Sequence, residues 1–307
     1  MNILSKLFYN TWNIGFIEKS VEDIVSGEET TFPVRWVKHN YKDRFFADPY
    51  LLSVDDSSLK VLVEDFPYYH KKGMISLLTV DRKTYQLLNR KVILKQPFHM
   101  SYPFIFRNAD GSVKWVAPEA SQSGNLFRYR MNPQSGMLEN QATLFQEPLL
   151  DSTILEHNGR YWLFCTKRGP ESNRDMFIYF SDCPEGPWMP HAKNPVVQDV
   201  TKARPAGNMV KMGGSIYRLS QKSDKCYGED INVSRVTTLT ETDFEEEPVK
   251  QIKACKDDYS LGFHTLNGFD GKAISVVDGL RKDFRPIRRI AYEMLNFIRK
   301  IHERNCK

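Results

Sequence analysis

The sequence predicts an all-β protein, a five-bladed β-propeller followed by an amphipathic α-helix. Short runs rich in Val, Ile, Tyr, Phe and Trp favour strands, and a polar turn separates two such runs five times. The turns recur at intervals of roughly fifty residues, and repeats of three or four antiparallel strands at this period are typical of propeller blades. Five repeats predict five blades. A β-sandwich followed by a second domain is the alternative, because 307 residues suffice for either.

The five turns consist of residues that tolerate the positive φ of tight hairpins. They are residues 55–58, Asp110 with Gly111, Asn158 with Gly159, Gly213 with Gly214, and Asp270 with Gly271. Further strands follow in the first four units, at residues 73–80, 125–130, 176–181 and 230–236. The fifth unit ends early, so we expect residues 11–17 or 34–38 to complete it and to close the ring.

The pattern becomes helical beyond Gly279. Apolar residues fall on one face, and the opposite face is basic, between Pro286 and Arg304. Residues 281–307 carry nine Lys and Arg against three Asp and Glu, whereas residues 1–280 carry 34 against 35. We therefore expect a propeller domain over residues 1–280 and a basic helix over residues 281–307. This helix suits an anionic membrane surface or a partner protein, or it packs on the propeller. The nearly neutral body predicts no nucleic-acid partner.

The cysteines and the N-terminus predict a cytoplasmic protein. The five cysteines are odd in number and widely spaced, as expected of reduced thiols. The first twenty residues lack a continuous apolar segment followed by a small-residue cleavage site, and no stretch approaches the length of a membrane span. With the basic helix, this predicts a cytoplasmic protein that can lie at the inner face of the cell membrane.

The innermost strand of each propeller blade lines the central axis, so residues far apart in sequence converge there. The first strand of each repeat offers polar residues flanked by core residues: Asp48, then His99 and Tyr102, then Asp151, then Arg204 and Asn208, and finally His264 and Asn267. The following strands add Glu64, Asp65, Glu119, Lys167, Arg168 and Gln221. Their recurrence at one place in the repeat predicts a single functional site on the axis.

Each of these residues also has a structural interpretation. Asp48 and Asp151 are placed to accept backbone N–H groups in turns. Glu64 and Asp65 end a strand, where a solvated edge is the simpler explanation, and a single histidine is more often a satisfied core residue than a ligand. Ca²⁺ or another cation on the axis near His264 is a further possibility, but no run has metal-ligand spacing, so the sequence predicts neither a metal nor another cofactor.

Several motifs follow one another over residues 45–267: FFADPY, VEDF, HMSYPF, APEAS, LLDSTILEHNGRYWLF, GPWMPHAKNPVV, ARPAG, YGEDI and FHTLN. In this order they resemble the propeller domain at the N-terminus of plant glucosamine inositolphosphorylceramide transferases and of its bacterial relatives. More distantly, Asp48 with Pro49 resembles the five-bladed furanosidase and fructosyltransferase superfamily, whose first blade also presents Asp-Pro. The distant resemblance is an analogy about function.

The distant resemblance implies a carbohydrate-active site. In that superfamily a carboxylate of the first blade is the base or nucleophile, a second carboxylate tunes it, and a glutamate is the acid. Asp48 matches the first position and Asp151 the second. The chain departs from the pattern at the acid, because the fourth blade begins with Arg204 where a glutamate is expected. Glu119, from another blade, is the remaining candidate acid.

This departure favours transfer over hydrolysis. Hydrolysis of a glycoside needs a protonated carboxyl group at the leaving oxygen, whereas a phosphate leaving group is already anionic and can be met by cations such as Arg204. We therefore expect a glycosyltransferase whose partners are an activated sugar donor and a glycan acceptor. The resemblance to the distant superfamily implies a furanosyl sugar, such as fructofuranose or arabinofuranose, transferred during synthesis of a capsule or another cell-surface polysaccharide.

In this hypothesis Asp48 acts as base or nucleophile, Asp151 and Glu119 share the acid–base roles, and Arg204 meets the leaving phosphate. The remaining candidates bind substrate: Asp65, His99, Tyr102, Arg168, Asn208, His264 and Asn267. Two alternatives stay open, a glycoside hydrolase of furanosides on the same site and a non-catalytic glycan-binding propeller.

Overall fold

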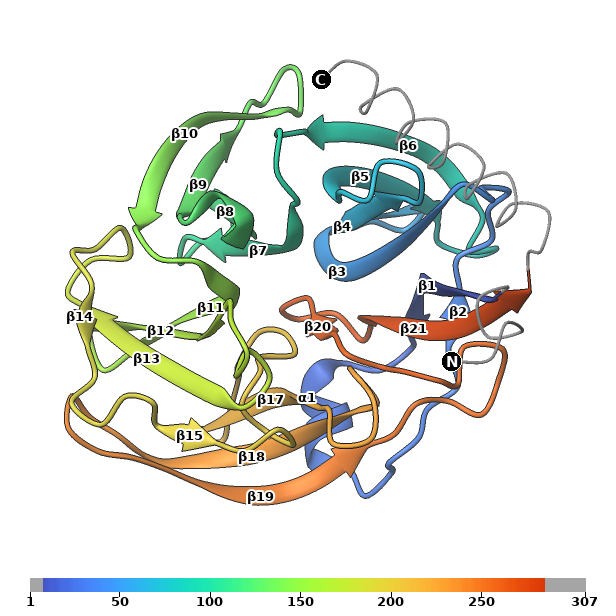
Figure 1. Cartoon of the computed structure of the whole chain (residues 1–307). Coiled ribbons are helices and arrows are strands. Elements are labelled where there is room, and N and C mark those ends of the chain that lie inside the picture. The colour runs from blue at the N-terminus through green and yellow to red at the C-terminus, as the bar shows by residue number, and fades with distance from the viewer. Residues whose placement is uncertain (1–7, 285–307) are drawn as a thin grey trace, which may run out of the picture.

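A computed structural model describes residues 8–284, which form five antiparallel sheets around a common axis (Figure 1). The predicted five-bladed propeller is confirmed, and the sandwich alternative is wrong. The predicted helix between Pro286 and Arg304 lies outside the described residues. None of the helices among residues 8–284 is long and apolar enough to cross a membrane.

Four blades follow one another along the chain, each from the axis outward. Blade one contains β3 (Arg44–Val54), β4 (Ser58–Pro67), β5 (Met74–Asp81) and β6 (Leu87–Leu94). Blade two contains β7 (Ser101–Arg107), β8 (Val113–Glu119), β9 (Leu126–Met131) and β10 (Leu138–Phe145). Blade three contains β11 (Leu149–His157), β12 (Arg160–Lys167), β13 (Asp175–Ser181), β14 (Met189–Pro190) and β15 (Val197–Gln198). Blade four contains β16 (Val210–Met212), β17 (Ser215–Lys222), β18 (Asp230–Leu239) and β19 (Phe244–Ile252).

The fifth blade joins the two ends of the described chain. From the axis outward it contains β20 (Leu266–Gly268), β21 (Ser275–Phe284), β1 (Phe8–Ile17) and β2 (Arg35–Trp36). β1 and β21 pair in register along their whole length, from Ile17 opposite Ser275 to Phe8 opposite Phe284. Both segments proposed to close the ring therefore take part in it. β21 reaches Phe284, past the predicted domain boundary at residue 280.

All five predicted turns connect the first and second strands of a blade. Asn158 and Gly159 adopt φ values of 53° and 72°, and Gly213 and Gly214 adopt 57° and 76°, as tight hairpins require. The outermost strands β6, β10 and β19 were not predicted. Their side chains are largely exposed, so these strands lack the alternation that marks a half-buried strand.

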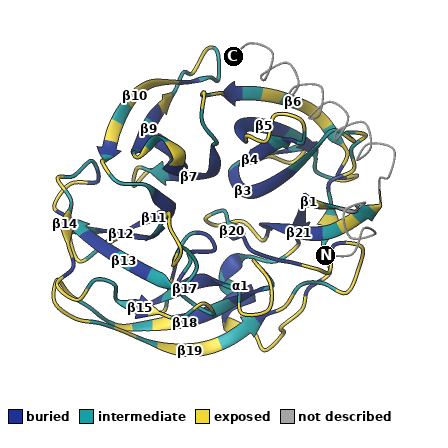
Figure 2. Cartoon of the chain, in the orientation of Figure 1, coloured by how far each residue is buried: buried dark blue, intermediate teal, exposed yellow. Residues whose placement is uncertain are grey.

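The core lies between neighbouring blades, and the inner strands are the most buried (Figure 2). β3 and β11 are buried over most of their length, whereas β10 and β19 expose many side chains. The short helix α1 (Val21–Ser26) begins at Ser20, which accepts a hydrogen bond from the Asp23 N–H. Its apolar residues pack near β16 and β20. The inner strands are therefore firmly supported from outside, and polar residues on them are held in fixed positions.

Candidate active site

Three inner strands carry a β-bulge at the same place. The first register shift with the second strand contains a non-glycine residue with positive φ in each of β3, β7 and β11: Asp48 at 51°, Tyr102 at 39° and Asp151 at 48°. Such conformations are costly for residues with a Cβ and cluster at functional sites. The three bulges change the direction in which these side chains point. Because the same strained conformation recurs in three blades, we take the region around these bulges as a candidate site.

Asp48 is held by groups from the two neighbouring blades, blade two and the closing blade. Its Oδ2 accepts a hydrogen bond from the Tyr102 N–H at 3.2 Å, and its Oδ1 accepts one from the Thr265 hydroxyl at 3.1 Å. Its own N–H donates to Asp278 Oδ2 at 3.0 Å. Burial, offset in part by the positive charge of His264, raises the pKa of Asp48 to about 6. Asp48 is therefore mostly ionised at neutral pH and precisely oriented.

His264 lies between two carboxylates. Its Nδ1 is 2.7 Å from Asp278 Oδ2, and its Nε2 is 3.4 Å from Asp48 Oδ1. The Trp12 ring stacks on the imidazole with 4.1 Å between centroids. Burial alone would lower the pKa of His264, but Asp278 and Asp48 raise it to about 9. The imidazolium thus balances part of the negative charge around Asp48.

Asp151 and Arg204 form a buried ion pair. Arg204 Nε donates to Asp151 Oδ2 at 2.5 Å and Nη2 donates to Oδ1 at 3.4 Å, while Nη1 donates to Asn173 Oδ1 at 3.1 Å. Gln221 Nε2 also donates to Asp151 Oδ2, at 2.8 Å. All three nitrogens of the guanidinium are therefore engaged. Arg204 is the partner of Asp151, so its charge is not free to meet a phosphate as the sequence suggested.

Glu119 faces the same ion pair from blade two. Its Oε2 is 3.8 Å from Arg204 Nη2, the atom that lies 3.4 Å from Asp151 Oδ1, so the two carboxylate oxygens are at most 7.2 Å apart, the sum of these distances. Its Oε1 accepts a hydrogen bond from the Ser121 hydroxyl at 2.9 Å. Burial and the charge of Asp151 raise the pKa of Glu119 to about 8. Glu119 is therefore mostly protonated at neutral pH and can act as an acid.

Glu64, rather than its neighbour Asp65, belongs to this group. The Asp65 carboxylate is fully buried away from it and bonds Arg44 at 3.1 Å and Arg90 at 2.5 Å, so the proposed substrate contact of Asp65 is replaced by a structural ion-pair role inside blade one. Adjacent residues of a strand point to opposite faces, and Glu64 points the other way. Its Oε1 lies 3.5 Å from His99 Nε2. Burial and the carboxylate of Asp48 raise the pKa of Glu64 well above its usual value.

His99 is a neutral hydrogen-bond donor beside Glu64. Its Nδ1 accepts from the Gly73 N–H at 2.8 Å, so in the neutral ring Nε2 carries the proton. Burial, together with the nearby charge of Arg168, lowers the pKa of His99 to about 4. Arg168 is exposed at the end of β12, and no carboxylate among residues 8–284 pairs with it. His99 and Arg168 thus keep polar atoms available to a ligand.

The other predicted binding residues are satisfied within the protein. The Tyr102 ring is fully buried, and its hydroxyl bonds Thr153 Oγ1 at 2.8 Å. Asn267 donates to the Pro49 carbonyl at 2.9 Å and accepts from the Asn208 N–H at 2.8 Å. The Tyr102 contact ties blade two to blade three, and the Asn267 contacts tie the closing blade to blades one and four. They favour a structural contribution from Tyr102, Asn208 and Asn267.

Sequence reasoning missed Asp278 and Tyr227. Asp278 is an acid inside the apolar run of β21, which is a signal that could have been used. Tyr227 lies in the connection between β17 and β18 and begins the motif YGEDI, which is the signal that could have been used. The Asp48, Glu64, Glu119, Asp151, Arg204, His264 and Asp278 side chains are called the axial cluster below.

Asp48, His264 and Asp278 each offer a ligand atom, and these atoms lie within 4.8 Å of one another. The trio is the group among residues 8–284 with the geometry of a metal site. Both imidazole nitrogens of His264 already face carboxylates, and its raised pKa keeps the ring protonated, whereas a metal ligand must be neutral. The trio is better described as a protonated histidine, His264, in contact with two carboxylates, Asp48 and Asp278.

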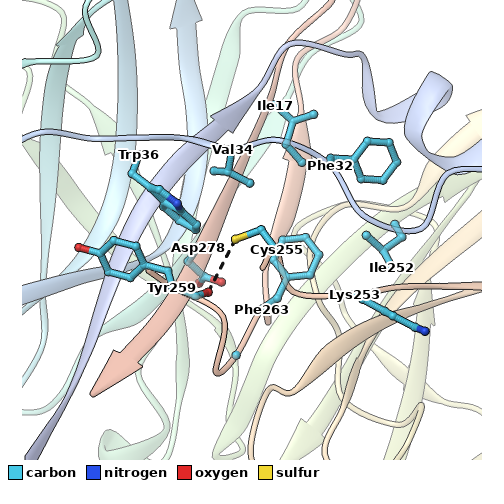
Figure 3. A pocket seen from close by; sticks show the side chains of 11 residues that line it. Ile17, Phe32, Val34, Trp36, Ile252, Lys253, Cys255, Tyr259, Phe263 and Asp278 are labelled. Carbon is cyan, nitrogen blue, oxygen red and sulfur yellow. Dashed lines mark hydrogen bonds between the residues drawn. The ribbon is translucent and has the colours of Figure 1, made fainter. Parts of the chain in front are cut away.

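Two further cavities do not compete with the axial cluster as a site. The pocket in Figure 3 lies between the closing blade and blade four and is lined mainly by apolar residues such as Ile17, Phe32 and Phe263, with Asp278 of the axial cluster also in its lining. Its free volume of about 10 Å³ is room for one water at most. A groove of about 770 Å³ between the closing blade and blade one is lined by Trp36 and Arg82, without any residue of the axial cluster.

Substitution of Arg204 with methionine should destabilise the fold. It leaves the buried Asp151 carboxylate with Gln221 as its remaining side-chain donor, and breaking a buried ion pair on one side costs about 3–5 kcal/mol. Urea denaturation followed by fluorescence measures this loss. Arg168→Met is the matched control, because Arg168 is exposed, and it should change the free energy of unfolding by about 0.5 kcal/mol or less. An equal effect of both substitutions would contradict the assigned role of Arg204.

Fold and site together define a class: a five-bladed propeller with a buried, carboxylate-rich cluster on its axis. Residues 31–278 match the family model described as "Glucosamine inositolphosphorylceramide transferase 1, N-terminal". The chain belongs to this family, which confirms the resemblance carried by the motifs.

Curated relatives and solved structures agree with this assignment. The chain is 32% identical over 257 residues to glucosamine inositolphosphorylceramide transferase 1 of Arabidopsis thaliana, covering 77% of this chain and 32% of that protein. The rice protein of the same name (Oryza sativa subsp. japonica) is 30% identical over 258 residues, with 78% and 34% covered. The chain thus spans about a third of the length of these relatives.

A thermostable family-43 glycoside hydrolase has a similar structure, with a TM-score of 0.54 at 11% identity over 74% of this chain and 84% of that one. A xylan β-1,4-xylosidase from Bacillus halodurans gives 0.51 at 15% identity, over 69% and 47%. At such low identity these similarities show the fold alone.

Proposed function

We propose that the axial cluster is the active site of a glycosyltransferase. The observation that carries this proposal is a pair of carboxyl groups in opposite states at neutral pH: Asp48, largely ionised, and Glu119, largely protonated. Asp151 raises the pKa of both, so it lies within electrostatic reach of each. An ionised base and a protonated acid about one sugar are what cleavage of a glycosidic bond requires.

Each residue then has a role. Asp48 removes the proton of the acceptor hydroxyl or attacks the anomeric carbon. Glu119 gives its proton to the leaving oxygen. Arg204 holds the Asp151 carboxylate in place through a buried ion pair, and the negative charge of Asp151 in turn favours the protonated form of Glu119. His99 and Arg168 have free donors for sugar hydroxyls or for the phosphate of the donor.

The names of the relatives support transfer as the reaction, because both are called transferases. Those names point to glucosamine as the sugar and inositolphosphorylceramide as the acceptor of the whole plant proteins. For this chain we propose an activated sugar donor and a glycan or glycolipid acceptor. The furanosyl sugar, the setting of surface polysaccharide synthesis at the inner membrane face and the membrane or partner contact of the helix from Pro286 to Arg304 stay predictions from the sequence.

The experiment is a donor and acceptor screen with the purified chain. UDP-linked glucosamine, N-acetylglucosamine and arabinofuranose are offered with inositol-phosphate lipids and with oligosaccharides, and products are read by mass spectrometry. We expect a product whose mass equals acceptor plus one sugar, absent with the Asp48→Asn variant. Failure of every donor, with the variant and the native chain alike, would count against transfer.

A glycoside hydrolase on the same cluster is the second candidate, favoured by Glu119, since hydrolysis needs such an acid. Aryl furanosides and pyranosides separate the two, because a hydrolase releases the phenol in water without an acceptor. The non-catalytic alternative predicts that a variant lacking the Asp48, Glu119 and Asp151 carboxylates still binds glycans, and that the native chain turns none over.

The pH dependence follows from the two carboxyl groups. Asp48 must be ionised, so kcat/KM should rise as the pH increases through about 6, and Glu119 must be protonated, so kcat/KM should fall as the pH increases beyond about 8. The expected profile is a bell with its maximum near pH 7. Initial rates between pH 4.5 and 9.5 measure it, and a rate that keeps rising to pH 9.5 would contradict Glu119 as the acid.

A further inference from the structure

The connections between the second and third strands of three successive blades all contact a residue of the axial cluster. In blade two, Ser121 bonds Glu119; in blade three, Asn173 bonds Arg204; and in blade four, the connection between β17 and β18 carries Tyr227. The first two contacts are polar and hold the charged groups. The third is aromatic, and the proposed reaction gives it no role.

The Tyr227 ring lies directly over the cluster. The Arg204 guanidinium is 5.3 Å from the ring centroid, and the His264 ring meets Tyr227 edge to face, with 5.4 Å between centroids. Even so, 42% of the residue is exposed. The ring thus lies over Arg204 and beside His264, while part of the residue remains accessible to solvent. Tyr227 is thus a half-exposed aromatic wall beside the proposed reacting groups.

The connection that carries Tyr227 is fastened to the closing blade. The Phe263 N–H donates to the Gly228 carbonyl at 2.7 Å, and the Gly228 N–H donates to the Ser223 hydroxyl at 3.1 Å. Gly228 has a φ of 62°, and a Cβ there would come within 2.6 Å of the Cβ of His264. Only glycine allows this close approach. The position of Tyr227 is therefore set by the fold and is ready before any ligand arrives.

We propose that Tyr227 is the stacking platform of the sugar-binding subsite: the apolar C–H face of the transferred sugar packs on the free face of the ring, with the anomeric carbon toward Glu119 and Asp48. This inference rests on the proposed function for the identity of the sugar. An aromatic face offers a large, rigid apolar surface beside polar groups, and it binds a sugar ring without the hydrogen bonds that discriminate one hydroxyl from another. Tyr227 is then a residue for sugar binding and specificity, and the carboxyl groups of Asp48 and Glu119 carry out the reaction.

Three substitutions of Tyr227 separate stacking from simple cover of the ion pair below it. Tyr227→Phe keeps the flat ring, Tyr227→Leu keeps an apolar cover over Arg204 without a flat face, and Tyr227→Ala keeps neither. We expect Tyr227→Phe to bind as the native chain does, and Tyr227→Leu and Tyr227→Ala to weaken sugar binding roughly three- to tenfold, the usual worth of an aromatic contact. Leu88→Ala, an exposed apolar residue on the outer strand β6, is the control and should change nothing.

Binding is measured by calorimetry in the Glu119→Gln background, so that no turnover is needed and failure of the proposed reaction does not hide the result. The probes are methyl glycosides of glucosamine and arabinofuranose, UDP alone, and UDP-N-acetylglucosamine. The proposal requires that the methyl glycosides and UDP-N-acetylglucosamine lose affinity in Tyr227→Leu while UDP alone does not. If Tyr227→Leu also loses affinity for UDP alone, the ring binds the nucleobase rather than the sugar, and the proposal is wrong. Equal affinity of Tyr227→Leu and Tyr227→Phe for every probe would also overturn it. So would a native chain that binds none of the sugars.

Discussion

Replacement of Asp48 with asparagine is expected to lower kcat/KM for sugar transfer by a factor of about 10³ and to leave the propeller folded. Asparagine has the shape of aspartate and can still accept the hydrogen bond from the Tyr102 N–H, but it can neither take a proton nor attack a carbon. Initial rates with the donor found in the screen measure the loss, and circular dichroism checks the fold. A folded Asp48→Asn variant that transfers sugar at the native rate would refute the assignment of Asp48.

Asp65→Asn is the matched control for this variant. Asp65 is a buried carboxylate of the same blade, but it pairs with Arg44 and Arg90 away from the axial cluster. We expect the opposite outcome: Asp65→Asn lowers the free energy of unfolding, because two arginines lose a charged partner, while the chemical step of the remaining folded protein is preserved. The two variants together separate the function of a buried acid from its contribution to stability.

Replacement of Glu119 with glutamine should lower kcat/KM by about 10² or more, because glutamine cannot protonate a leaving oxygen. The loss should depend on the leaving group. Donors whose leaving group is a poor one need the proton most and should lose most, while donors with an acidic phenol or phosphate should lose least. The alkaline limb of the pH profile near 8 should disappear in this variant. Rates over a series of aryl glycosides and UDP-linked donors measure the dependence.

Glu139→Gln is the control for Glu119, since Glu139 is an exposed glutamate on the outer strand β10. It should leave rates and pH profile unchanged. If Glu119→Gln loses activity by the same factor for every leaving group and keeps the alkaline limb, Glu119 positions Asp151 or Arg204 and another group supplies the proton.

Much of this site could be predicted because residues at the same position in successive propeller repeats lie at the same position in successive blades, and their inner strands meet at the axis. Asp48 and Asp151 occupy the same place on the first strands of blades one and three, and Glu119 ends the second strand of blade two; the structure brings Asp151 into electrostatic reach of both of the others. The positive φ of Asp48 and Asp151 was not foreseen, although a bulge next to an Asp-Pro or Asp-Ser pair explains why short polar residues stand there.

The choice between Glu64 and Asp65 could not be made from sequence. Neighbouring residues of a strand face opposite sides, so the decision depends on the register of β4 with β3, where Ala47 pairs with Glu64. The sequence contains no direct information on that register. Asp65 is explained by Arg44 and Arg90, which come from strands on either side of β4 and reach it through the fold.

The role of Arg204 changed for a similar reason. Sequence places an arginine where a related superfamily has a glutamate, and a free cation at that place would suit a phosphate. In the structure the Arg204 guanidinium donates hydrogen bonds to Asp151 and Asn173. The candidate acid near it, Glu119, comes from a different blade. A partner that comes from another repeat cannot be read from local spacing.

The protonation state of Glu119 tests the central claim most directly, and it needs no substrate. Infrared spectra of the native chain and of the Glu119→Gln variant, recorded from pH 5 to pH 9.5, resolve the C=O stretch of a protonated carboxyl group. We predict that the difference between the two contains this band at pH 6.5 and that the band disappears as the pH rises through about 8. A difference spectrum that shows an ionised carboxylate at pH 6.5 would contradict Glu119 as the acid.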